Sequence, residues 1–203
     1  MKKMNLFFHA ALKCIVLIML LPAFLYAGPK YEKAIFAGGC FWCMEPPFEK
    51  LKGVIMVTSG YTDGKGANPN YENYADKGFV EAVEVVYDPA LINYMELLTV
   101  FWKQIDPTDP DGQFVDRGPQ YRSAIFYLNE NQKLLAEKSK ADIGKSGRFK
   151  KPIVTEIIKA SAFYKAEEYH QKYHQKNPIR YKYYRSRSGR DQFLDRTWGK
   201  DGK

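Results

Sequence analysis

The sequence has little cysteine and little histidine, three residues of each among 203. It has no internal repeat or low-complexity block, and its composition is far from that of collagens and coiled coils. With 45% hydrophobic residues, the chain is also too apolar to be disordered. The net charge of +8 falls to +5 when the first 27 residues are set aside, which gives no reason to expect nucleic acid as a partner. With these classes excluded, the composition is that of an ordinary globular domain.

The first 27 residues have the pattern of a signal peptide. Three lysines within residues 1–13 precede the uncharged run CIVLIMLLPAFL, and no acidic residue occurs before residue 28. That run is too short to cross a bilayer, which takes about 20 residues. Ala27 is a small residue suited to cleavage, so we expect an exported, periplasmic or extracellular protein, with a membrane-anchored form if the segment is not cleaved. We interpret residues 28–203 as one domain with a basic tail from about residue 179, which we expect to be solvated or to bind an acidic surface.

Signal removal leaves two cysteines, Cys40 and Cys43, in a C-x-x-C arrangement. A disulfide that closes so small a loop adds little stability through chain entropy, because that effect grows with loop length. Redox chemistry or metal binding explains such a pair better. His170 and His174 have the i, i+4 spacing of a helix face, so a Cys₂His₂ metal site is one alternative.

The hydrophobic periodicity and the turn residues predict elements in the order β-α-β-β-α-β-α-β-α. The expected strands are 33–39, 53–61, 81–87, 120–128 and 152–159, and the expected helices are 41–52, 93–105, 129–144 and 166–176. The first six elements match a split β-α-β arrangement. The expected fold class is therefore α+β: a ferredoxin-like α/β plait with a mixed, mostly antiparallel sheet and flanking helices. Two long polar loops, 62–78 and 106–119, are the kind that often carries function.

Cys40 is expected where the first strand ends and the first helix begins. Gly38 and Gly39 permit a sharp turn before it. A helix N-terminus favours a thiolate, so we expect Cys40 to be a reactive thiol with a lowered pKa. Phe41 and Trp42 are suited to form the wall of an apolar pocket beside it.

Several blocks of the sequence, taken in order, resemble the peptide methionine sulfoxide reductase A family. GCFWCMEPPFEKLKGV (39–54) resembles the signature around the family's nucleophilic cysteine. GYTDG (60–64) and NPNY (68–71) resemble its long loop, and EAVEVVYDP (81–89) resembles the strand after that loop. The later blocks are LLTVFWKQIDPT (97–108), DRGPQYRSAIF (116–126) and FYKAEEYHQKYHQKNP (163–178). The resemblance covers about residues 33–178, nearly the whole mature chain.

The resemblance implies reduction of the S epimer of methionine sulfoxide, free or in proteins, through a cysteine sulfenic acid and without a metal or organic cofactor. It implies that Cys40 is the nucleophile and that Glu81 protonates the sulfoxide oxygen. Oxygen is a poor leaving group until it is protonated, and a carboxyl group near apolar rings has the raised pKa that such an acid needs. The residues implied to hold the substrate's S-methyl group are Phe41 and Trp42, and those implied to assist are Tyr71, Tyr121 and Asp116.

Two positions depart from the family's usual pattern. The family often has His two residues before its acidic residue, where this chain has Phe79, and often has Gly where this chain has Cys43. Since the sequence after residue 178 contains no cysteine, Cys43 is the only internal candidate for a resolving thiol. We expect a monomer that is recycled by a thioredoxin-like reductant and acts on methionine sulfoxide in oxidised proteins.

Two other functions are compatible with some of these residues. Cys40 and Cys43 are spaced like the pair of a thioredoxin-like disulfide oxidoreductase, although the bulky Phe41 and Trp42 between them argue against it. The same cysteines with two histidines would form a small metal-binding module.

Overall fold

The structure is a computed structural model in which residues 30–199 are described, so the predicted signal peptide lies outside the described residues. Within residues 30–199, no helix combines the length and the apolar character that a membrane crossing requires.

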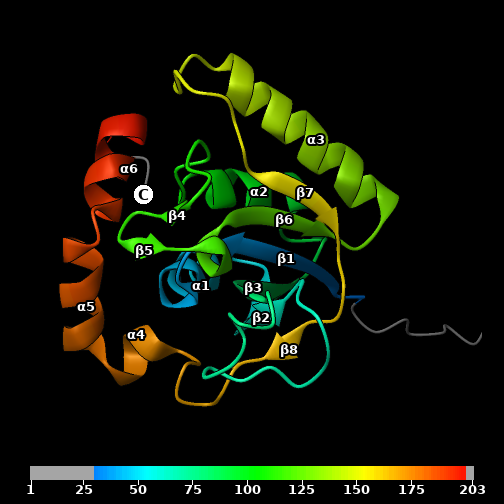
Figure 1. Ribbon diagram of the computed structural model, residues 1–203. Helices are drawn as coiled ribbons and strands as arrows, with labels where there is room; N and C mark the ends of the chain where they lie inside the picture. Colours follow the sequence, from blue (N-terminus) through cyan, green and yellow to red (C-terminus); the bar gives the residue numbers. More distant parts are fainter. Residues whose placement is uncertain (1–29, 200–203) are drawn as a thin grey trace, which may run out of the picture.

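A six-stranded sheet in the order β7-β6-β1-β3-β2-β8 forms the centre of the molecule (Figure 1). Its strands are β1 (Glu32–Gly38), β2 (Val54–Thr62), β3 (Val80–Tyr87), β6 (Ser123–Tyr127), β7 (Glu156–Lys159) and β8 (Tyr164–Lys165). Neighbouring strands are antiparallel except β6 and β7, which are parallel. The inner order β6-β1-β3-β2 is that of a split β-α-β plait, which confirms the expected fold class.

One face of the sheet is covered by α1 (Phe41–Glu49), α2 (Tyr94–Trp102) and α3 (Glu130–Lys145). Successive side chains of a strand point to opposite faces, so alternate residues such as Phe36 and Val83 enter the larger core under these helices. Phe36 stacks there between Phe48 and Phe101, with ring centroids 5.2 Å from each. The other alternate residues meet a smaller core closed by the chain after β7.

The predicted helix over 166–176 is wrong for most of its length. Only α4 (Tyr173–Lys176) is helical, and Lys172 before it has a left-handed φ of 53°. The reason is the edge of the sheet: the side-chain amide of Gln171 accepts from the N–H of Ser59 at 3.0 Å and donates to its carbonyl at 2.9 Å. Residues 166–171 thereby satisfy the open edge of β2 instead of forming their own helical bonds. His170 and His174 consequently do not share a helix face.

The chain after residue 178 folds into α5 (Pro178–Arg187) and α6 (Arg190–Trp198), which differs from the expected solvated tail. The two helices lie beside α1 and the short hairpin of β4 (Gly112–Gln113) and β5 (Asp116–Arg117), which the 3₁₀ turn η1 (Pro119–Tyr121) follows (Figure 1). Arg190 is completely buried and donates to the carbonyl oxygens of Gly38, at 3.0 Å, and Gln104. Part of the basic charge therefore turns inward, toward backbone oxygens next to Cys40.

Candidate active site

Cys40 is the N-cap residue of α1 and is buried, with 7% of its surface exposed. The turn before it requires Gly39, whose φ is +81°. A Cβ atom at Gly39 would lie 2.6 Å from the Cβ of Gln113 and 2.9 Å from Nη2 of Arg190. The predicted position of the thiol, between a strand and a helix, is therefore confirmed, and the hairpin and α6 close around it.

The expected direction of the Cys40 pKa shift is wrong. Burial raises the pKa of the Cys40 thiol well above its usual value, and the negative charges of Glu81 and Asp116 add to this effect. A hydrogen bond from Tyr184 acts in the opposite direction. The helix N-terminus is present, but burial and two carboxyl groups outweigh it, so the free site holds a protonated thiol near neutral pH.

Glu81 lies on β3 directly opposite Tyr61 of β2 and has 2% of its surface exposed. Its Oε2 accepts the backbone N–H of Phe41 at 3.0 Å, and its Oε1 accepts the hydroxyl of Tyr74 at 2.9 Å. Burial raises the pKa of the Glu81 carboxyl group to about 8, although these two hydrogen bonds each lower that pKa. A carboxyl group with that pKa is mostly protonated at pH 7 and can serve as an acid next to the thiol.

Tyr74, which the sequence analysis did not single out, supplies the side-chain hydrogen bond to Glu81. It is buried, and its hydroxyl also hydrogen-bonds that of Tyr121. Tyr71 is 43% exposed and lies over this group, with its ring centroid 5.9 Å from that of Tyr74. Phe79 is buried against Tyr164, and its apolar ring donates no hydrogen bond to Glu81, whereas Tyr74 does. Tyr74 is one of 15 tyrosines, and nothing in the sequence distinguishes it from the others.

The aromatic residues after Cys40 are held by the segment that follows β8. Nε1 of Trp42 donates to Nδ1 of His170 at 3.1 Å, and the indole stacks on Tyr173 with centroids 3.7 Å apart. Phe41 is buried, with its ring centroid 4.9 Å from that of His170. Trp42 is partly exposed, so an apolar surface remains open beside the thiol.

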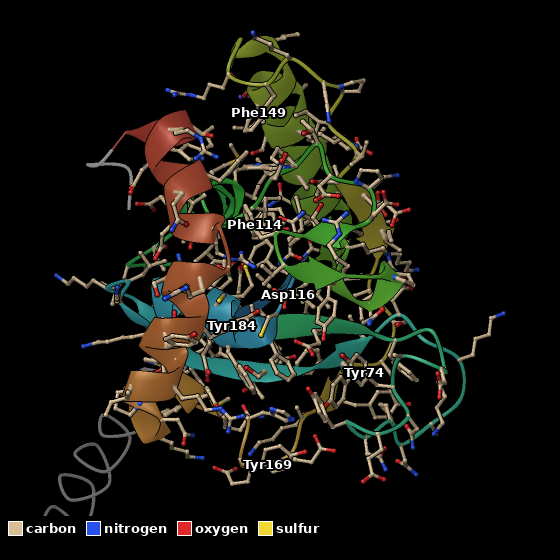
Figure 2. All side chains as sticks on the ribbon, turned by 60° about the vertical axis from the view of Figure 1, so that its left-hand side comes forward. Tyr74, Phe114, Asp116, Phe149, Tyr169 and Tyr184 are labelled. Carbon is tan, nitrogen blue, oxygen red and sulfur yellow. The ribbon has the colours of Figure 1, made fainter. Side chains whose placement is uncertain are left out.

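Asp116 and Tyr184 approach Cys40 from the other side, and Figure 2 shows them close together where α5 comes forward. The hydroxyl of Tyr184 lies 2.6 Å from both carboxylate oxygens of Asp116. Asp116 also accepts the backbone N–H of Cys40. Burial raises the pKa of Asp116, while Tyr184, Arg190 and the Cys40 N–H lower it.

Cys43 is fully buried one helical turn after Cys40, and its N–H donates to the carbonyl of Cys40 at 3.0 Å. Both cysteines are free thiols. The residues of the metal-binding alternative do not converge, because His170 is bonded to Trp42 and Nε2 of His174 lies 3.2 Å from Glu49. Within residues 30–199, no group of three or more His, Cys, Asp or Glu side chains is arranged to hold a metal ion.

These features define a thiol-based reductase: a buried cysteine, a protonated carboxyl group bonded to the next backbone N–H, a partly open aromatic surface and a second thiol. Comparisons with known proteins agree. The sequence pattern of the family described as peptide methionine sulfoxide reductase matches residues 32–202.

Two bacterial relatives have the same kind of name. The peptide methionine sulfoxide reductase MsrA of Halalkalibacterium halodurans is 54% identical over 173 residues, which are 84% of this chain and 98% of the relative. MsrA of Bacillus licheniformis is also 54% identical over 173 residues, 84% of this chain and 96% of the relative.

Solved structures show the same fold. Reduced Mxr1 of Saccharomyces cerevisiae has a TM-score of 0.69 at 30% identity, over 73% of this chain and 87% of that one. Methionine sulfoxide reductase A of Corynebacterium diphtheriae has a TM-score of 0.65 at 31% identity, over 75% and 78%. Mxr1 in complex with Trx2 has a TM-score of 0.52 at 25% identity, over 75% and 91%.

The chain therefore belongs to the peptide methionine sulfoxide reductase family. It is an oxidoreductase of the MsrA type, which confirms the resemblance found in the sequence and replaces the two alternative functions.

Proposed function

We propose that this enzyme reduces methionine S-sulfoxide, free and in proteins, with Cys40 as the nucleophile and Glu81 as the acid. The observation that carries this assignment is the hydrogen bond from the Phe41 N–H to Oε2 of Glu81, which brings a buried, protonated carboxyl group to the residue next to the thiol. The roles follow those named for the family's matching positions.

The first half-reaction balances without a cofactor. The Cys40 sulfur attacks the sulfoxide sulfur, Glu81 gives its proton to the sulfoxide oxygen, and the thiol proton restores Glu81. The S–O bond of the substrate then breaks as the oxygen passes to Cys40, which leaves methionine and a sulfenic acid. Tyr74 and Tyr121 hold Glu81 in place, and the partly open surface of Trp42 is suited to the substrate's S-methyl group.

A single-turnover assay tests this proposal. Reduced enzyme without external reductant is mixed with excess dabsyl-methionine S-sulfoxide or with the R epimer, and methionine is quantified. We expect one methionine per enzyme from the S epimer and none from the R epimer. Equal reaction of both epimers, or no methionine, would contradict the proposal.

The protonation state gives a pH prediction. Since Glu81 has a pKa of about 8 and Cys40 ionises well above its usual range, the reactive form carries both protons below pH 8. We expect the single-turnover rate constant to be level below about pH 8 and to fall as the pH rises through that value, because Glu81 loses the proton it must donate. A rate that climbs steadily from pH 7 to 10 would instead indicate that ionisation of the thiol, and not protonation of Glu81, controls the reaction.

Recycling is proposed to pass through Cys43. Its thiol attacks the sulfenic sulfur of Cys40, which forms a Cys40–Cys43 disulfide and releases water. A thioredoxin-like dithiol then reduces the disulfide and is itself oxidised. The solved complex of the similar protein Mxr1 with Trx2 supports a reductant of this kind. A relaxed disulfide has Cβ atoms about 3.5–4.5 Å apart, whereas helical neighbours lie about 5–6 Å apart, so the first turn of α1 has to shift.

Replacing Cys43 with serine separates the two half-reactions. We expect Cys43→Ser to release one methionine per enzyme at a near wild-type rate, because Cys40 and Glu81 are unchanged. Turnover driven by thioredoxin is expected to collapse, since residues 28–203 then contain no second thiol to form the disulfide. The comparison of burst and steady-state methionine formation in one assay checks this, and steady turnover at the wild-type rate would show that Cys43 does not resolve.

We also propose export of the mature enzyme and a monomeric state. The charge and apolar pattern of residues 1–27 supports export, and a site built from residues of one chain supports a monomer. Cell fractionation with N-terminal sequencing, and light scattering of the purified enzyme, test the two statements.

A further inference from the structure

We infer that Tyr184, on α5, the first of the two C-terminal helices, is a further catalytic residue, whose hydroxyl group hydrogen-bonds the sulfur of Cys40 and links it to Asp116. This inference rests on the proposed role of Cys40 as the nucleophile. Tyr184 lies after the sequence blocks that carry the resemblance, which end at about residue 178, and within residues 32–202, where the family's sequence pattern matches.

The measured geometry places the Tyr184 hydroxyl on Asp116: its Oη lies 2.6 Å from both Oδ1 and Oδ2 of the carboxyl group. The same hydroxyl group is near enough to Cys40 to lower the pKa of that thiol through a side-chain hydrogen bond. Asp116 is bonded to the backbone N–H of Cys40 as well, so the three residues form one closed group. Figure 2 shows Tyr184 and Asp116 close to each other beside α1.

The chemical role follows from the charges in this group. The Asp116 carboxylate disfavours negative charge on the Cys40 sulfur, and so does Glu81. The Tyr184 hydroxyl is the hydrogen-bonding side chain that lowers the pKa of Cys40. It therefore offsets part of the unfavourable effect of Asp116 and donates a hydrogen bond to the sulfur when the thiol proton leaves and negative charge develops there.

The helices that carry Tyr184 are anchored at the same place. Arg185, the next residue, donates to the carbonyl of Cys43 at 3.1 Å, to Gln104 at 3.2 Å and to Asp191 at 2.9 Å. Arg190 at the start of α6 is bonded to the carbonyl of Gly38. These bonds fix α5 against both ends of the segment around the nucleophile, so the Tyr184 hydroxyl is held where it is needed.

Its neighbour in sequence provides a matched control. Tyr183 is 65% exposed, and its ring lies under the guanidinium group of Arg187 at 5.3 Å. Tyr184 instead packs edge-on against Trp42 with ring centroids 6.0 Å apart. The same change, tyrosine to phenylalanine, therefore removes an inward hydroxyl at one position and a solvated hydroxyl at the next.

The experiment measures the reactivity of Cys40 directly. In a Cys43→Ser background, iodoacetamide alkylation of Cys40 is followed by mass spectrometry between pH 7 and 11 for Tyr184→Phe and Tyr183→Phe. A hydrogen bond to a charged group is worth roughly one to two pKa units, so we expect Tyr184→Phe to slow alkylation about tenfold or more at a fixed pH below the Cys40 pKa. Tyr183→Phe is expected to leave the profile unchanged. Equal profiles for the two variants would overturn the inference.

A second background distinguishes a direct role from one that passes through Asp116. With Asp116→Asn, Tyr184→Phe still slows alkylation if the hydroxyl bonds the sulfur, whereas no further effect would show a purely positioning role and overturn the inference. Tyr184→Phe alone leaves the buried Asp116 carboxylate without one of its hydrogen-bond donors, which could destabilise that variant. The Asp116→Asn background removes this carboxylate, so the comparison does not depend on the stability of the single variant. Single-turnover methionine formation by the same variants is measured in parallel. If Tyr184→Phe still forms methionine and its alkylation profile is unchanged, the role of Tyr184 is refuted while the proposed function stands.

Discussion

Replacing Cys40 with serine is expected to abolish methionine sulfoxide reduction, with a loss of at least about 10³-fold in single-turnover rate. Serine keeps roughly the same shape at the N-cap of α1, but its hydroxyl is a far weaker nucleophile than the thiol and cannot form a sulfenic acid. Serine is also a favourable N-cap residue, so the thermal midpoint should remain close to that of the wild type.

Cys43→Ser is the matched control for this substitution. It makes the same chemical change three residues away, in the same buried helix turn, and should keep the first half-reaction. Residual activity of Cys40→Ser above about a tenth of the wild-type rate would count against Cys40 as the nucleophile.

Replacing Glu81 with glutamine is expected to lower the single-turnover rate constant by about 10² to 10⁴, with little change in the substrate concentration for half-saturation. The amide keeps the shape and can still bond Tyr74 and the Phe41 N–H, but it cannot deliver a proton to the sulfoxide oxygen. The fall in rate above about pH 8 should disappear in this variant, because the titrating group is gone.

Glu45→Gln provides the control, because Glu45 is a second buried carboxyl group and lies on α1. Both oxygens of Glu45 accept the backbone N–H of Lys172 at 3.0 Å, and burial raises its pKa to about 7. Its partner lies in the turn before α4, and we expect Glu45→Gln to retain most of the activity. An unchanged rate in Glu81→Gln with an inactive Glu45→Gln would assign the acid role to Glu45.

The site works as a coupled group of protons. Charge on Glu81 raises the pKa of Cys40, so deprotonating one group makes deprotonation of the other harder. The free enzyme therefore keeps both protons near neutral pH, which protects the thiol from indiscriminate oxidation since thiolate is the reactive form. When the sulfoxide oxygen takes the proton from Glu81, the resulting carboxylate can accept the thiol proton, so the two groups do not carry negative charge together.

The sequence predicted the order of the plait and the position of Cys40 because both depend on local signals. Apolar alternation predicts the strands, and capping residues mark the start of helices: Asn93 and Glu96 form a capping box at the start of α2. Local sequence signals did not predict the direction of the Cys40 pKa shift. It depends on burial and on Glu81 and Asp116, which are distant in sequence and reach the thiol only through the folded sheet and hairpin.

The hydrogen-bond partners of Glu81 and Asp116 could not be predicted from the sequence for the same reason. Tyr74 and Tyr184 are two of 15 tyrosines, and only the fold shows that one meets Glu81 and the other Asp116. The segment around Gln171 has a helical pattern, but the open edge of β2 competes successfully for its hydrogen bonds. In each case a non-local contact decided the outcome.

Mass spectrometry of the enzyme after one turnover without reductant tests the central claim most directly. Trypsin releases residues 34–50 as one peptide that contains both Cys40 and Cys43. After reaction with one equivalent of methionine S-sulfoxide, we expect this peptide to be two hydrogens lighter in the wild type, as a Cys40–Cys43 disulfide. In Cys43→Ser we expect it to be one oxygen heavier, with the oxygen on Cys40. Formation of methionine with the peptide unchanged, or with the oxygen on Cys43 in Cys40→Ser, would contradict the account.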